Sequence, residues 1–142
     1  MYQKLIIIGN LGRDPEQRFL ESGKAVTSFS VATSEKWTGQ DGQPQERTVW
    51  WRVSAFGKLA EICKDYLHKG SKVYVEGRVQ ADPKTGGPRI WNGQDGAPRA
   101  SFELTADTVK FLSPKGDGSA LPAERGATVV PTDIEFGDDI PF

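Results

Sequence analysis

The sequence predicts an all-β domain, a five-stranded Greek-key barrel with a single helix, followed by a tail without regular structure. Three observations support this prediction. Short apolar or alternating runs are separated by glycine-rich and polar turn signals. One amphipathic stretch follows the third run. The chain has 142 residues, of which 37% are hydrophobic, enough for one compact core but not for two.

Five stretches have the pattern of strands. The clearest is 72–80, where Val73, Val75, Gly77 and Val79 alternate with polar or charged residues. The other four stretches are residues 4–8, 25–33, 48–56 and 101–111. A polar, turn-rich connection over residues 38–44 joins the second strand to the third, and places Trp37 at the edge of a loop.

A helix is predicted between the third and fourth strands. Apolar residues recur there with helical spacing, at Leu59, Ile62, Cys63, Tyr66 and Leu67. Gly70 is suitably placed to end the helix. Because Cys63 lies on the apolar stripe, we interpret it as a core thiol rather than a nucleophile.

The order of these elements, with one helix after the third strand, is that of an OB-fold barrel. Two glycine-containing turn signals within residues 82–98 flank Arg89, Ile90 and Trp91. They predict a long hairpin between the fourth and fifth strands, a connection that often binds the ligand in OB-folds. We expect this domain to span residues 1–112.

The charge divides the chain into two parts. Residues 1–112 hold 16 Lys and Arg against 13 Asp and Glu, a net charge of +3. Residues 113–142 hold 2 against 6, a net charge of −4. Residues 113–137 have the composition of a flexible linker, and residues 138–142 form an acidic tip. The division suggests two surfaces with different partners, although a solvated tail that only aids solubility fits the composition equally well.

The expected location is the cytoplasm. The single cysteine cannot form an internal disulfide, which suits a reducing compartment. No apolar run approaches the length of a membrane span, and the first residues do not resemble a secretory signal. We therefore expect no membrane partner.

The aromatic residues of the third strand indicate a binding surface. By alternation one face carries Trp50, Arg52, Ser54 and Phe56, and the other carries Val49, Trp51, Val53 and Ala55. The first face mixes aromatic rings with a guanidinium, which suits bases and phosphates better than a core. Trp91 adds a ring in the hairpin. The cations placed to contact phosphates are Arg52, Lys58, Lys69 and Arg89. A packing role remains the alternative for each aromatic residue taken singly.

Several segments of the chain resemble the bacterial single-stranded DNA-binding protein family. They are LGRDP (11–15), ATSEKW (32–37), FGKLAE (56–61), YLHKGS (66–71) and VYVEG (73–77). Their order, together with the last five residues, makes the resemblance specific over about residues 3–112 and at the tip. It implies a homotetramer that binds single-stranded DNA, located with the nucleoid, and no cofactor or metal.

The resemblance also implies roles for individual residues. The family stacks DNA on three tryptophans and a phenylalanine, whose positions are occupied here by Trp37, Trp50, Phe56 and Trp91. Trp51 replaces a smaller polar ring beside the subunit interface, and with Tyr74 it is expected at an oligomer contact. The family's tip recruits replication, recombination and repair proteins, and the tip residues here are Asp138, Asp139, Ile140, Pro141 and Phe142. Their aspartates and terminal carboxylate suit a basic-rimmed apolar pocket.

Two other classes of function are considered. An enzyme is disfavoured because one His and one Cys provide neither a catalytic triad nor metal-ligand spacing. An OB-fold module that prefers RNA, or that serves only as a protein adaptor, remains open, because stacking alone does not distinguish DNA from RNA.

Overall fold

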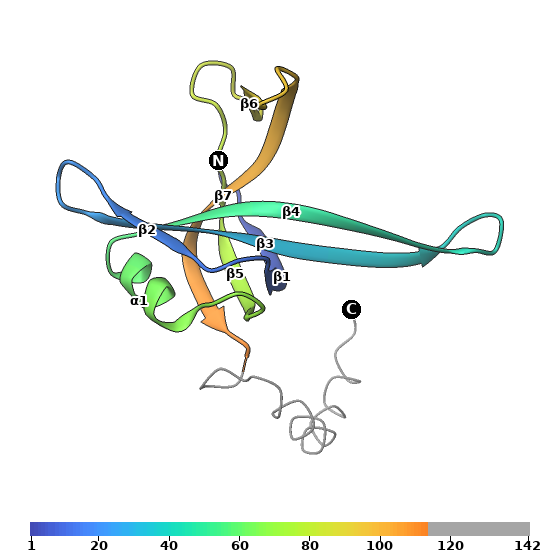
Figure 1. The fold of residues 1–142 in the computed structure, drawn as a ribbon, viewed down its shortest axis with the longest axis horizontal. Helices are drawn as coiled ribbons and strands as arrows, with labels where there is room; N and C mark the ends of the chain where they lie inside the picture. The colour runs from blue at the N-terminus through green and yellow to red at the C-terminus, as the bar shows by residue number, and fades with distance from the viewer. Residues whose placement is uncertain (114–142) are drawn as a thin grey trace. The chain divides into compact units, whose positions relative to one another are not determined.

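The computed structural model describes residues 1–113, so nearly all of the predicted linker (113–137) and the whole tip (138–142) lie outside the described residues. Met1–Leu112 form one compact unit. Its elements are β1 (Leu5–Leu11), β2 (Glu16–Phe19), β3 (Ala25–Thr38), β4 (Pro44–Phe56), α1 (Lys58–Tyr66), β5 (Lys72–Val79), β6 (Arg89–Asn92) and β7 (Pro98–Phe111) (Figure 1).

Five of the strands close into a barrel. β1 pairs with β5, β5 with β7, β7 with β4 and β4 with β3, and β3 returns to the end of β1 at Leu11↔Val31. The β4–β7 pairing is parallel, and the other four are antiparallel. This closed five-stranded barrel with one helix after its third strand confirms the predicted OB-fold.

The core is formed by the inward-facing residues of the barrel strands. Val31, Val53, Val73, Val75 and Leu104 are fully buried. The helix α1 packs on β3 and β4 and contributes two further buried residues to the core, Ala60 and Cys63. One polar contact fixes the helix on the barrel, because the Thr27 hydroxyl donates a 2.6 Å hydrogen bond to the Ala60 carbonyl.

Two long hairpins extend from the barrel (Figure 1). The first, here called the β3–β4 arm, continues beyond the predicted strand ends, with pairs from Thr33↔Val49 to Thr38↔Pro44. Trp37 therefore lies within β3 and not in a loop. The second, the β6–β7 arm, is the long hairpin expected after the fourth strand, and its two strands pair from Arg89↔Ser101 to Asn92↔Pro98.

Some expected positions are wrong in detail. β2 was not predicted, and Tyr66, the last residue of α1, is 61% exposed although it belongs to the predicted apolar stripe. Val79 keeps the inward parity of Val75 and lies opposite the buried Leu104, but as the last residue of β5 it is 48% exposed. Phe102, in the terminal pair of the β4–β7 ladder, is likewise 59% exposed. The helix α1, nine residues long, is neither long nor apolar enough to cross a membrane, and no other helix occurs in residues 1–113.

Candidate nucleic-acid interface

The two arms diverge at the place where the β4–β7 pairing ends. That pairing joins Trp51–Ser54 of β4 to Phe102–Thr105 of β7, so within residues 1–113 the β4 edge before Trp51 has no strand partner on this side. A groove of about 880 Å³ follows the open edge. Its lining includes Arg47, Trp50 and Arg52 from β4 and Ser101 from β7.

Most of the predicted DNA-binding side chains lie on the outer face of the sheet formed by β4, β7 and β6. Directly opposed residues share a face and alternate residues return to it. Arg52 is opposite Glu103, and Arg89 is opposite Ser101, which alternates with Glu103. The outer face therefore carries Trp50, Arg52, Phe56, Arg89 and Trp91. Trp50 is 53% exposed and Trp91 is 46% exposed, so both rings are accessible from solvent.

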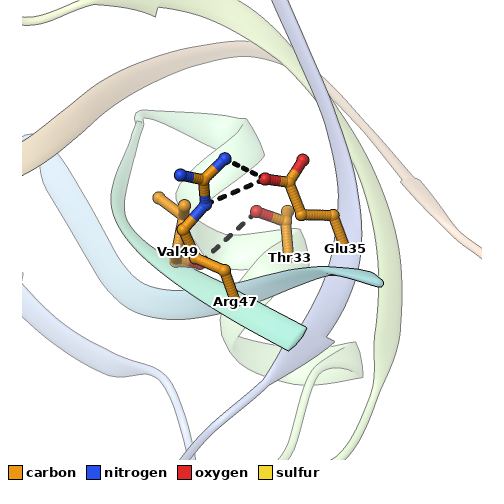
Figure 2. Close-up of polar contacts among 4 residues, drawn as sticks. All are labelled: Thr33, Glu35, Arg47 and Val49. Carbon is orange, nitrogen blue, oxygen red and sulfur yellow. Dashed lines mark hydrogen bonds and ion pairs between the residues drawn. The ribbon is translucent and has the colours of Figure 1, made fainter. Parts of the chain in front are cut away.

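Trp37 lies on the opposite face of the β3–β4 arm. Trp50 is opposite Ala32 in the ladder, and Trp37 follows Ala32 by an odd number of residues. The neighbours of Trp37 are charged. The Arg47 guanidinium carbon lies 5.5 Å from the centroid of its ring, and Arg47 also forms an ion pair with Glu35 (Figure 2). Strand alternation thus places Trp37 and Trp50 on opposite faces, although the sequence analysis grouped them as one set of stacking residues.

The hairpin tryptophan is held by neighbours on β7. The Trp91 indole Nε1 donates a 2.8 Å hydrogen bond to the Ser101 hydroxyl. Arg89 Nε lies 3.8 Å from Oε2 of Glu103, whose side chain is only 7% exposed. This carboxylate offsets part of the Arg89 charge. Sequence reasoning missed Glu103, although a charged residue between apolar positions of a strand was a visible signal.

The predicted lysines lie at the two ends of the helical segment. Lys58 is the first residue of α1 and follows Phe56 closely in the chain. The Lys69 backbone amide donates a 2.8 Å hydrogen bond to Oδ1 of Asp14, in the turn after β1. Sequence reasoning did not single out Lys24, whose Nζ lies 5.9 Å from the centroid of the Phe56 ring. Each of these lysines is exposed.

The two predicted oligomer-contact residues do not lie together. Trp51 faces the barrel interior at the groove, where its Nε1 donates a 3.1 Å hydrogen bond to the Thr33 hydroxyl. That hydroxyl donates a 3.4 Å hydrogen bond to the Val49 carbonyl oxygen. Figure 2 draws this contact as a dashed line. Tyr74 is on the outer face of β5, and β7 separates β5 from β4. Beside Tyr74, the outer face of β1 presents Ile6 and Ile8, which are half exposed.

Tyr74 belongs to a polar cluster with Glu76 and Lys4. Its hydroxyl donates a 2.7 Å hydrogen bond to Oε2 of Glu76, and Lys4 Nζ lies 2.6 Å from Oε1. These contacts, Lys4 first and Tyr74 second, hold the pKa of the Glu76 carboxyl below its usual value. The carboxylate in turn raises the pKa of Tyr74 and the pKa of Lys4. Within residues 1–113 no cluster of three or more His, Cys, Asp or Glu side chains is arranged to hold a metal ion.

Comparison with known proteins identifies the family. Residues 2–112 match the model of the single-strand binding protein family. This chain belongs to that family. It is 44% identical over 124 residues to a single-stranded DNA-binding protein of Neisseria meningitidis serogroup B, covering 87% of this chain and 67% of that protein. It is also 44% identical over 115 residues to one of Xanthomonas axonopodis pv. citri, covering 81% of this chain and 60% of that protein.

A solved structure of a single-strand binding protein shares the fold. An SSB of Plasmodium falciparum in complex with single-stranded DNA superposes with a TM-score of 0.65 at 26% sequence identity. The similarity covers 80% of this chain and 97% of that one. The resemblance inferred from short segments of the sequence is therefore confirmed at the level of family and fold.

Proposed function

We propose that this protein binds single-stranded DNA without sequence preference, and that it does so as a binding protein rather than an enzyme. One observation carries the proposal: two half-exposed tryptophans, Trp50 on β4 and Trp91 on β6, lie on the same outer face, together with Arg52 on β4. We call Trp50, Arg52, Phe56 and Trp91 the stacking face. Membership of the single-strand binding protein family supports the same function.

The chemistry of the stacking face suits unpaired bases. Every base has a π-face, so stacking on an indole or phenyl ring binds single strands and discriminates little between sequences. In single-strand binding proteins as a class, each stacked base contributes about 1–3 kcal/mol, a magnitude that we take over from the class. Arg52, Lys58, Lys69 and Arg89 would add phosphate contacts, which depend on salt and not on sequence. The Glu103 carboxylate, 3.8 Å from Arg89 Nε, would offset part of the charge that Arg89 offers to a phosphate.

Trp37 requires a longer path for the bound strand. Because Trp37 and Trp50 are on opposite faces of the β3–β4 arm, one strand can stack on both only by passing around the arm. The open edge of β4 and the groove beside it lie on such a path. We therefore propose that the strand wraps around the arm, with Arg47 held against Trp37.

The domain arrangement and the assembly are also proposals. Residues 1–112 would bind DNA and assemble, 113–137 would act as a linker, and Asp138, Asp139, Ile140, Pro141 and Phe142 would recruit replication, recombination and repair proteins in the cytoplasm, at the nucleoid. A homotetramer would cover Tyr74 and the exposed Ile6 and Ile8, and also Trp51 beside the groove. Burial of the two isoleucines supplies the hydrophobic contribution that such an interface needs.

The test is the intrinsic tryptophan fluorescence of the full chain during titration with poly-dT at low and high salt. We expect strong quenching that saturates at a fixed ratio of nucleotide to protein and is weaker with duplex DNA. Trp50→Ala and Trp91→Ala should each lower both the quenching and the affinity. Phe19→Ala, which removes an exposed ring from β2 outside the stacking face and the groove, is the control and should change neither.

Two outcomes would contradict this function. Absence of quenching at either salt concentration would make the tryptophans packing residues and would favour an OB-fold adaptor. Tighter binding of poly-U than of poly-dT in competition would favour an RNA-binding module.

A further inference from the structure

The contact beneath Trp50 is unusually close. A Cβ atom built on Gly12 would lie 2.5 Å from Cζ3 and 2.8 Å from Cη2 of the Trp50 indole. Carbon atoms in contact are normally about 3.5–4.0 Å apart. The six-membered ring of Trp50 therefore rests directly on the Gly12 backbone, at the end of β1, in space that any other residue would fill.

The backbone on either side of this contact is held in place. The Gly12 amide donates a 3.1 Å hydrogen bond to the Ser30 carbonyl. The Leu11 amide donates to the Ser71 carbonyl at 2.9 Å, and the Leu11 carbonyl accepts from the Gly70 amide at 2.9 Å. Since these bonds tie the segment to two other parts of the fold, a side chain at position 12 would displace the indole rather than the backbone.

The strand β3, between Gly12 and Trp50, also leaves room for the indole ring. Trp50 on β4 is directly opposite Ala32 on β3, and β1 reaches β3 at the pairs Asn10↔Ala32 and Leu11↔Val31. The indole thus extends from β4 across β3 toward the end of β1. The residue opposite it has the smallest side chain, and the residue at its far edge has none. A larger residue at position 32 or position 12 would push the Trp50 indole away from the sheet.

We infer that Gly12 is a positioning residue for Trp50, and that Gly12 and Ala32 form a seat that holds one face of the indole and leaves the other free to stack on a base. This inference deepens the proposed function and rests on it for its DNA-binding readout. The seat is a property of the unbound protein, so its geometry can be measured without DNA. A side chain at position 12 would move the ring edge by about 1 Å to restore normal contact.

The experiment compares Gly12→Ala with Gly87→Ala in the full chain. Gly87 is the matched control because its added Cβ would meet only Thr85 Oγ1, at an ordinary 3.6 Å. The first readout is acrylamide quenching of Trp50 fluorescence without DNA, in a background with Trp37, Trp51 and Trp91 replaced by Phe. Gly12→Ala should change the quenching constant and the emission maximum, and Gly87→Ala should change neither.

The second readout is the affinity for poly-dT in the parent background. We expect Gly12→Ala to weaken binding by between about 5-fold and 150-fold, the range of one lost stacking contact. In a Trp50→Phe background the same glycine replacement should cause little further loss, because phenylalanine lacks the second ring that faces Gly12. If Gly12→Ala fails to fold on its own, recovery of folding by Trp50→Phe would support the seat.

Two results would overturn the inference. One is unchanged acrylamide quenching of Trp50 in Gly12→Ala. The other is an equal loss of affinity in the parent and Trp50→Phe backgrounds, which would indicate a backbone effect. Failure of the parent protein to bind poly-dT would instead refute the proposed function, while the quenching measurement would still decide whether the seat exists.

Discussion

Trp51 and Phe102 lie side by side across the parallel β4–β7 pair, with ring centroids 5.3 Å apart and ring planes tilted by 47°. The two rings meet at the end of the closed barrel, where the arms diverge. Trp51 packs against the core and is fixed by its hydrogen bond to Thr33, whereas Phe102 is 59% exposed. The pair therefore connects the core of the barrel, which Trp51 contacts, to the wall of the groove, which both rings line.

Phe102→Ala is expected to lower the free energy of unfolding by about 0.5–1.5 kcal/mol, the contribution of an aromatic pair. Simple loss of buried area would contribute little, because the ring is mostly exposed. Urea unfolding measures the change, with Phe19→Ala as the control, since Phe19 is similarly exposed, at 66%, in the short strand β2. Equal destabilisation by both variants would show that the contact with Trp51 has no special effect.

Arg52→Gln is expected to weaken binding to single-stranded DNA and to reduce its salt dependence. Each phosphate contact contributes about 0.7 to the slope of log K against log salt concentration for single strands. The slope should therefore fall by about that amount, as measured by titration at several salt concentrations. Arg78→Gln is the control, because Arg78 lies on β5, 3.6 Å from Asp107. A slope unaltered by Arg52→Gln would show that Arg52 does not contact a phosphate of the bound strand.

Hydrophobic alternation predicted the barrel because burial selects one face of each strand. In β5, Val73 and Val75 are fully buried while their neighbours are partly or fully exposed. Where a strand buries neither face, its sequence no longer alternates between apolar and polar residues. β2 and the distal parts of β3 and β4 are exposed on both faces, so their residues show no alternation. Those segments are held by backbone ladders, and the polar composition of residues 38–44 concealed how far the strands extend.

Part of the stacking face could be predicted from the sequence, again because side chains alternate between the two faces of a strand. Alternation within β4 places Trp50, Arg52 and Phe56 together from the sequence alone. The positions of Trp91 and Trp37 depend on ladder registers, Trp91↔Arg99 and Ala32↔Trp50, which no local pattern shows. The contact of Gly12 with Trp50 joins two segments 38 positions apart in the numbering, and only the three-dimensional arrangement reveals it.

Cys63 is expected to be unreactive in the folded protein. Its thiol is completely buried, and burial raises the pKa of that thiol to about 12, so almost no thiolate forms at neutral pH. A thiol reagent such as Ellman's reagent should label Cys63 in denaturant but not in native buffer at pH 8. Rapid labelling of the native protein would contradict this placement in the core.

The same burial gives Cys63 a pH-dependent effect on stability. Above about pH 9 the unfolded chain loses the thiol proton while the folded chain keeps it, so stability falls as the pH rises toward 12. The loss is at most about 1.4 kcal/mol per pH unit. Comparing the pH dependence of urea unfolding in the parent and in Cys63→Ala isolates this contribution, because the other titrating groups are common to both proteins. Identical pH dependence in the two proteins would show that folding does not raise the pKa of the Cys63 thiol.

Glu76→Ala is expected to lower the pKa of Tyr74. In the parent, the hydrogen bond to the Glu76 carboxylate is the main cause that raises the Tyr74 pKa, with burial and the negative charge adding to it. Removing the carboxylate removes the first and third of these causes and leaves the nearby positive charge of Lys4, which favours the phenolate. Ultraviolet titration of the phenolate measures the change, and Tyr74→Phe identifies which of the three tyrosines contributes the signal. An unchanged titration would mean that the Tyr74–Glu76 hydrogen bond does not persist in solution, and Tyr74 would then be free to serve another contact.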